Sequence, residues 1–235
     1  MTRRFAVVYE DTADFDIATE LADRVLRDAV VYLREQNLDD YRTWLGKSHG
    51  GDKLSWNGVK HLSRDAGVRG HGHFDGVRGA ADAVAARKAI LYLRREFPGL
   101  DAIVLMRDRD KQPLRRFGFE QARREDHGGL PIVVGLAVPM REAWVLSGYE
   151  TDDDEAELLE AVRTRLKFDP RTRSHDVPDP KRALRELTDG DPGRERRCWF
   201  DTPLPTLRDR GRDNGLADYL DDVAARLSPL FGHAA

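Results

Sequence analysis

The sequence has little cysteine and no long apolar run, and both features narrow the class of protein. Cys198 is the one cysteine in 235 residues, which excludes an internal disulfide framework and fits a reducing cytoplasm. No apolar stretch approaches the length of a transmembrane helix. The first residues, Met-Thr-Arg-Arg, lead directly into an expected strand, so no signal peptide is predicted. We therefore expect a cytoplasmic protein without a membrane partner.

Two nucleotide-binding motifs and an overall basic charge are also absent. The chain has neither the G-x-G-x-x-G motif of dinucleotide-binding folds nor a Walker motif, so a dinucleotide ligand is not expected. The formal net charge is −3, without the overall basicity typical of many nucleic-acid-binding proteins. Positive charge is local instead. Attraction for nucleic acid would have to come from arginines such as Arg115, Arg116, Arg123 and Arg124.

What is present predicts one substantial core of the α/β class. Hydrophobic residues make up 40% of the chain and charged residues 34%, as in soluble globular proteins. Apolar runs at residues 4–9, 102–106 and 131–138 predict strands buried on both faces. Apolar residues at helical spacing predict helices over 17–33 and 80–97. The alternation indicates a Rossmann-like, mostly parallel sheet flanked by helices.

The segment from residue 37 to residue 79 interrupts this alternation. Its periodicity fades and glycines are frequent, which predicts an insertion with one or two short helices. His71 and His73 in this segment could chelate a metal, although a histidine pair in a glycine-rich loop is more often neither ligand nor catalyst. We predict a catalytic domain over residues 1–190, containing the 37–79 insertion, and a helical extension over 191–235 packed on the same core.

Acidic residues follow each of the three expected strands. Glu10 and Asp14 follow the first, Asp108 and Asp110 the second, and Glu142 the third. Because the carboxyl ends of parallel strands share one edge of a sheet, these carboxylates are expected to converge. Crowded carboxylates repel one another unless a cation lies between them, and oxygen ligands favour Mg²⁺ or Mn²⁺.

Four or five such oxygens can hold two divalent cations about 4 Å apart, the arrangement used for in-line displacement at phosphorus. A simpler interpretation is also open. Asp11 or Asp14 could cap the first helix, and Asp108 to Asp110 could be a polar loop in which Asp110 caps the next turn.

These motifs, taken together, resemble the Toprim domain of topoisomerases, primases and the overcoming-lysogenization-defect (OLD) nucleases. In that domain a glutamate follows the first strand and Asp-x-Asp follows a later one. The closer likeness is to the OLD-type branch and to small bacterial proteins of the DUF4276 kind. Their Glu-x-x-x-Asp motif matches Glu10 and Asp14, and their Glu-Ala-Trp motif matches Glu142. Asp-Pro-Lys-Arg-Ala-Leu resembles their late lysine motif and matches Lys181. The resemblance covers residues 4 to 190.

The resemblance implies a metal-dependent nuclease that nicks or cleaves DNA phosphodiester bonds, in an anti-phage or mobile-element setting. Catalysis would fall to Glu10, Asp108, Asp110 and Lys181, and Asp14 and Glu142 would complete a site for two Mg²⁺ or Mn²⁺ ions. OLD proteins carry an ATPase domain, so a separate ATPase partner is implied here. RNA as substrate and a homo-oligomer stay open.

Two other functional interpretations of the same residues remain open. A Mn²⁺-dependent glycosyltransferase also uses Asp-x-Asp after an apolar strand, but it leaves Glu10, Glu142 and Lys181 without roles. A Toprim-like regulatory subunit with vestigial acids would need no catalysis, but every expected carboxylate is retained.

Overall fold

A parallel sheet forms the centre of the molecule. The computed structural model describes residues 2–47, 53–152 and 155–232. In these ranges four parallel strands pair in the order β2-β1-β5-β6, namely β1 (Arg3–Val8), β2 (Arg42–Leu45), β5 (Ala102–Asp108) and β6 (Ile132–Ala137). A separate antiparallel pair joins β3 (His73–Phe74) and β4 (Val77–Arg78). The predicted α/β fold with a parallel sheet is confirmed.

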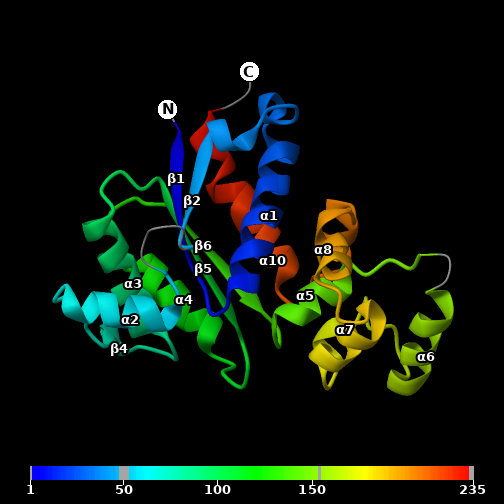
Figure 1. Ribbon diagram of the computed structural model, residues 1–235. Coiled ribbons are helices and arrows are strands. Elements are labelled where there is room, and N and C mark those ends of the chain that lie inside the picture. Colours follow the sequence, from blue (N-terminus) through cyan, green and yellow to red (C-terminus); the bar gives the residue numbers. More distant parts are fainter. Residues whose placement is uncertain (1, 48–52, 153–154, 233–235) are drawn as a thin grey trace.

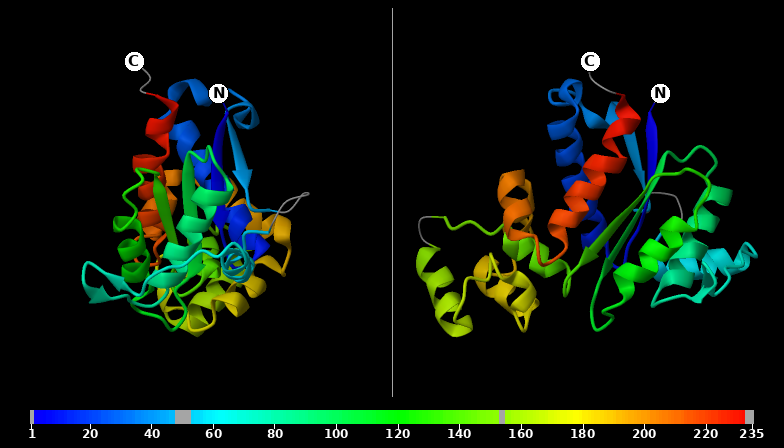
Figure 2. Two further views of the ribbon diagram at one scale, coloured as in Figure 1. Left: turned by 90° about the vertical axis from the view of Figure 1, so that its left-hand side faces the viewer. Right: turned by 180° about the vertical axis from the view of Figure 1, so that it is seen from behind.

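Helices cover both faces of the sheet. Figure 1 and Figure 2 show α1 (Thr12–Ala29) and α10 (Leu216–Arg226) on one face, and α2 (Trp56–Asp65), α3 (Ala83–Glu96) and α4 (Arg115–Arg124) on the other. Alternate residues of each strand enter the two cores, so Val104 packs with the α1 side and Ile103 with the α3 side. Because both faces are covered, the strands read as continuous apolar runs.

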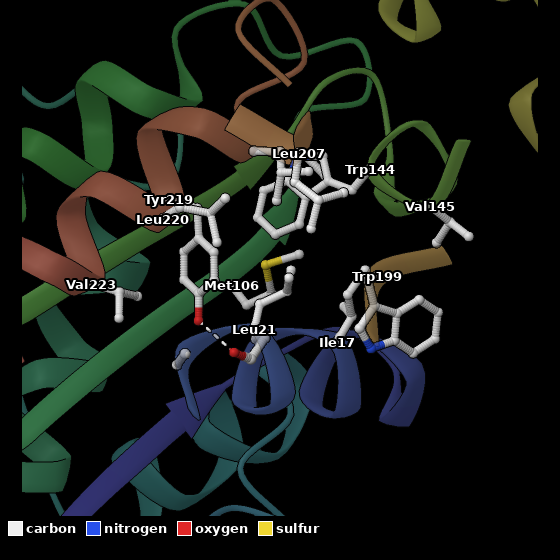
Figure 3. Close-up of a cluster of buried hydrophobic side chains, with 14 of the residues drawn as sticks. Ile17, Leu21, Met106, Trp144, Val145, Trp199, Leu207, Tyr219, Leu220 and Val223 are labelled. Atoms are coloured by element: carbon white, nitrogen blue, oxygen red, sulfur yellow. Dashed lines mark hydrogen bonds between the residues drawn. The ribbon is translucent and has the colours of Figure 1, made fainter. Parts of the chain in front are cut away.

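The C-terminal helix α10 shares the core of α1 and the sheet. Figure 3 shows Tyr219 pointing from α10 toward α1, and its hydroxyl donates a hydrogen bond of 2.7 Å to the carbonyl of Ala18. Trp144 stacks on the Tyr219 ring with centroids 5.2 Å apart, and its indole N–H donates to the carbonyl of Asn214 at 2.8 Å. These contacts fix the segment after β6 against α10.

The remaining helices lie beyond the carboxyl edge of the sheet or beside α1. They are α5 (Arg141–Ser147), α6 (Ala156–Leu166), α7 (Pro180–Thr188), α8 (Pro192–Phe200) and α9 (Leu204–Arg210). Short 3-10 turns are η1 (Val31–Leu33), η2 (Leu38–Asp40), η3 (Ser174–Asp176) and η4 (Ser228–Phe231). Across the described ranges, no helix has the length and apolar character needed to cross a membrane.

Two elements differ from the sequence-based expectation. Residues 37–79 supply β2, which pairs with β1 from Arg3↔Arg42 to Ala6↔Leu45, so the first part of this segment belongs to the sheet. Only α2 and the β3-β4 pair, which follow β2, fit the expected insertion. The stretch between β5 and β6 forms α4, whereas the sequence pointed only to a basic stretch. Gly50 and Gly51 of the expected insertion lie outside the described residues.

The order of the strands contains one topological switch point. From β1 the chain passes through α1 to β2 on one side of β1, and from β2 it passes through α2 and α3 to β5 on the other side of β1. Strands β1 and β5 are therefore neighbours at a topological switch point, where open α/β sheets bind ligands beyond the carboxyl ends of their strands. Glu10 and Asp108 stand at these two strand ends.

Candidate active site: a carboxylate cluster at the switch point

Asp108 is the centre of a group of acids. It is the last residue of β5, and its Oδ1 accepts a hydrogen bond of 2.7 Å from the backbone N–H of Arg141, the first residue of α5. Burial, followed by the charge of Asp14, raises the pKa of Asp108 to about 8 despite this hydrogen bond. The charges of Glu142 and Glu10 raise it further. In the metal-free chain Asp108 therefore holds a proton at neutral pH.

Asp14 lies in the first turn of α1 and is almost fully buried. Its Oδ2 accepts from the backbone N–H of Asp11 at 2.8 Å as part of a capping box. Its Oδ1 lies 3.7 Å from Nε of Arg141. Burial raises the pKa of Asp14, while the Asp11 N–H and Arg141 lower it. Asp11 is thus the N-cap of α1, which confirms the simpler interpretation for that residue, and Asp14 is both the N3 partner in its capping box and a member of the cluster around Asp108.

Glu142 has an incomplete set of partners. Its Oε1 accepts from Nη2 of Arg141 at 3.1 Å, whereas its Oε2 is buried and has no hydrogen-bond partner among the described residues. A buried carboxylate oxygen without a partner is costly to leave unpaired. Among the described acids of this cluster, Glu142 is thus the one with a fully buried oxygen that has no hydrogen-bond partner.

A further acid, Glu195, reaches the same cluster from α8. Burial raises the pKa of Glu195, and the charges that act on it include Arg141 and Glu142. The sequence did not single out Glu195, because it stands in the charged run Arg194-Glu195-Arg196-Arg197 that reads as a solvated helix face. No strand end precedes it, so the strand-end pattern could not have found it.

Glu10 is more exposed and is held by an arginine. Its Oε1 lies 3.2 Å from Nε of Arg107, and its Oε2 accepts from the backbone N–H of Asp108 at 3.3 Å. Nη1 of Arg107 also lies 3.0 Å from Oδ1 of Asp82, whose Oδ2 is 2.5 Å from Nε of Arg115. Asp82 adopts a left-handed backbone (φ 64°), a conformation that costs about 1–3 kcal/mol in a non-glycine residue. Asp82 thus joins two arginines, Arg107 and Arg115, and no sequence motif pointed to it.

Asp110 and Lys181 are placed apart from the cluster. Asp110 has φ 49°, and its Oδ2 lies 3.0 Å from Nη1 of Arg115, so this carboxylate joins the Asp82–Arg115 network. Lys181 is exposed in the first turn of α7. No hydrogen bond or ion pair joins Lys181 to another described residue. Helix α7 itself packs against α5, which carries Glu142.

The expected basic surface on α4 is largely neutralised. Arg115 is buried between Asp82 and Asp110, Arg116 pairs with Asp218 at 2.9 Å, and Arg123 pairs with Asp222 at 2.7 Å. The expectation that these arginines attract nucleic acid stays a prediction, although acids of this chain pair with three of them. The guanidinium of Arg124 lies over the exposed ring of Phe117.

The carboxylate oxygens of this cluster suit a hard divalent cation, but two arginine side chains pair with some of them. In the described part of the chain, no three Asp, Glu, His or Cys side chains form a group ready to hold a metal ion. Arg141 lies between Asp14 and Glu142, and Arg107 holds Glu10. The all-oxygen donor set, the unpaired Oε2 of Glu142 and the pKa of Asp108, raised by burial and by neighbouring acids, all fit Mg²⁺ or Mn²⁺. A cation could bind there once Arg141 withdraws.

The histidine pair lies elsewhere. Nε2 of His71 is 3.5 Å from Glu125, and both His71 and His73 are exposed near β3.

Comparisons with family models, with curated proteins and with solved structures find no match to this chain. The Toprim resemblance therefore remains a prediction from the sequence motifs.

Proposed function

We propose that the chain is a divalent-metal-dependent nuclease that cleaves phosphodiester bonds of DNA. The observation that carries the proposal is the group of buried and neighbouring acids at the β1–β5 switch point. Burial, followed by the charges of Asp14, Glu142 and Glu10, raises the pKa of Asp108 to about 8. Acids crowded to this degree are stabilised by a cation, and a ligand crevice is expected at this place in the sheet.

Within this proposal each acid has a defined part. Asp14, Asp108, Glu142 and Glu10 would hold Mg²⁺ or Mn²⁺, with Glu195 at the edge of the group. The bound cations would activate water and stabilise the leaving oxygen in an in-line displacement. Asp110 would take part only after leaving Arg115. Lys181, exposed on α7 and without an ion-pair partner among the described residues, would neutralise charge that develops on the phosphate.

The sequence motifs support the same reaction. The Toprim-like order of Glu10, Asp-x-Asp, Glu142 and Lys181 is typical of OLD-type nucleases, and the described sheet is parallel as that resemblance requires. The resemblance also implies a separate ATPase as partner.

The test is nicking of supercoiled plasmid by the pure protein with Mg²⁺ or Mn²⁺. Asp108→Asn should abolish nicking, because it removes the charge at the centre of the cluster. Lys181→Ala should lower the rate by about two to three powers of ten while metal binding persists, the usual effect of losing one charge-stabilising donor. Asp65→Asn is the matched control, since Asp65 is exposed on α2 and pairs only with its neighbour Arg64. Nicking by Asp108→Asn at the wild-type rate would refute the proposal.

A second candidate function has one observation in its favour. Arg141 already compensates Asp14 and Glu142, as expected of a non-catalytic Toprim-like partner subunit. Absence of nicking by the wild-type protein in every metal, together with absence of Mn²⁺ binding, would favour that function.

A further inference from the structure

A cavity of about 430 Å³ adjoins the carboxylate cluster. Its walls come from α2, from the start of α3 and from the carboxyl end of β5. Arg107 links the two sites, because it lines this cavity and also pairs with Glu10 at 3.2 Å. The volume lies in the range of about 300–1,000 Å³ that takes small-molecule ligands.

The uncompensated charge of this cavity is positive. Lys60 on α2 and Lys88 on α3 line it, and neither makes a hydrogen bond or an ion pair with any described residue. The one acid in the lining, Asp82, is already paired with Arg107 and Arg115. The two ammonium groups are therefore free to bind an anion.

The inner wall is flat and rigid. Trp56 donates its indole N–H to the carbonyl of Met106 at 2.8 Å and stacks on Phe119, with centroids 5.3 Å apart and planes 20° apart. The guanidinium of Arg107 lies 5.3 Å from the Trp56 ring centroid. Val59 and Val84 add apolar surface. Guanidinium planes and aromatic surfaces of this kind stack nucleobases.

We infer that this cavity holds one nucleotide unit of the substrate strand, with its phosphate bound by Lys60 and Lys88 and its base against the Arg107–Trp56 wall. The inference rests on the proposed nuclease function and names its binding subsite. Since Arg107 also holds Glu10, the bound nucleotide lies next to the phosphodiester bond that the carboxylate cluster would cleave. In this proposal the two lysines supply attraction for the strand in addition to any from the α4 arginines.

The test measures binding without cleavage. A fluorescently labelled single-stranded oligonucleotide is titrated in EDTA by anisotropy, at several salt concentrations, and dTMP is titrated by calorimetry as the mononucleotide probe. The variant is Lys60→Glu with Lys88→Glu. The control is Arg64→Glu with Arg69→Glu, which makes the same change in net charge at exposed residues outside the cavity. Circular dichroism confirms that both variants are folded.

The lysine variant should bind the oligonucleotide at least tenfold more weakly than the control variant does. The slope of log K against log salt should become shallower by about 0.7 if the two lysines neutralise one phosphate. The lysine variant should also lose binding of dTMP. Equal oligonucleotide affinity in the lysine and control variants would overturn the inference, and so would loss of dTMP binding alone, because the cavity would then take free mononucleotides.

Failure of this inference is distinguishable from failure of the nuclease proposal. Binding in EDTA does not depend on metal or on Asp108. If Asp108→Asn still nicks plasmid, the nuclease mechanism fails whatever the lysine variant does. If the lysine variant binds normally while Asp108→Asn is inactive, the cleavage site stands and the subsite is overturned.

Discussion

Asp108→Asn should stabilise the metal-free chain, and the gain should depend on pH in a defined way. Burial and neighbouring acids raise the pKa of Asp108 from 3.8 to about 8 in the folded chain. Between these values the folded chain keeps a proton that the unfolded chain releases. Raising the pH from 4 to 8 therefore lowers the free energy of unfolding, and this decrease is complete above pH 8.

The magnitude follows from the size of the shift. At 1.36 kcal/mol per pH unit, the free energy of unfolding of the wild type falls by about 4 kcal/mol between pH 4 and pH 7 because of Asp108. Asparagine is neutral in both states and keeps an oxygen that can accept from the Arg141 N–H, so it avoids the loss. The variant should match the wild type near pH 4 and exceed it by up to about 4 kcal/mol at pH 7. In a chain of this size that gain corresponds to roughly 8–16 °C in Tm.

The assay is urea or thermal unfolding in EDTA at pH 4, 5.5, 7 and 8.5, followed by circular dichroism. Asp65→Asn removes the same charge from an exposed position and should change the stability by less than about 0.5 kcal/mol at every pH. A variant that is less stable than the wild type at pH 8.5, or whose gain is the same at every pH, would refute the proposed repulsion at Asp108.

Three other predictions concern the surroundings of the site. Asp82→Asn removes one of the two carboxylates that pair with buried Arg115, leaves Asp110 as its partner, and should lower the free energy of unfolding by about 1–3 kcal/mol. An unchanged urea midpoint would contradict this prediction. Gly118→Ala places a Cβ 2.0 Å from the carbonyl oxygen of Ala81 and should destabilise by about 1–3 kcal/mol or more, whereas Gly72→Ala, with open space around it, should not. Burial raises the pKa of the Cys198 thiol to about 12, so a thiol reagent at pH 8 should label it only after unfolding. Rapid labelling of the folded chain would contradict that burial.

The strands that could be predicted are those buried on both faces. The runs at 4–9, 102–106 and 131–138 became β1, β5 and β6, since a covered strand is apolar throughout. Strand β2, with the sequence Arg-Thr-Trp-Leu, is short, half-exposed and at the sheet edge, so no periodicity marks it. Its existence depends on pairing with β1, a contact between distant segments.

The candidate site also contains residues that the sequence predicts and residues that it does not. Glu10, Asp108 and Glu142 follow strand ends, and the parallel topology brings them to one edge. Asp82 is the residue before α3 and Glu195 lies in α8, and neither follows a strand end, so no local pattern points to them. The partners of the arginines could not be predicted either, because each pair is decided by packing. Asp110 is an example, since its φ of 49° turns it to Arg115 although it lies two residues from Asp108.

The central claim is that the acids around Asp108 hold a divalent cation, and calorimetry of Mn²⁺ binding tests it most directly. Titrations at pH 7 in buffers of different ionisation enthalpy measure both the affinity and the number of protons released. Because the metal-free Asp108 has a pKa of about 8, the wild type should release close to one proton per chain on binding. Asp108→Asn should bind Mn²⁺ far more weakly and without that proton. Equal affinity in the two proteins, or binding by the wild type without proton release, would contradict the account.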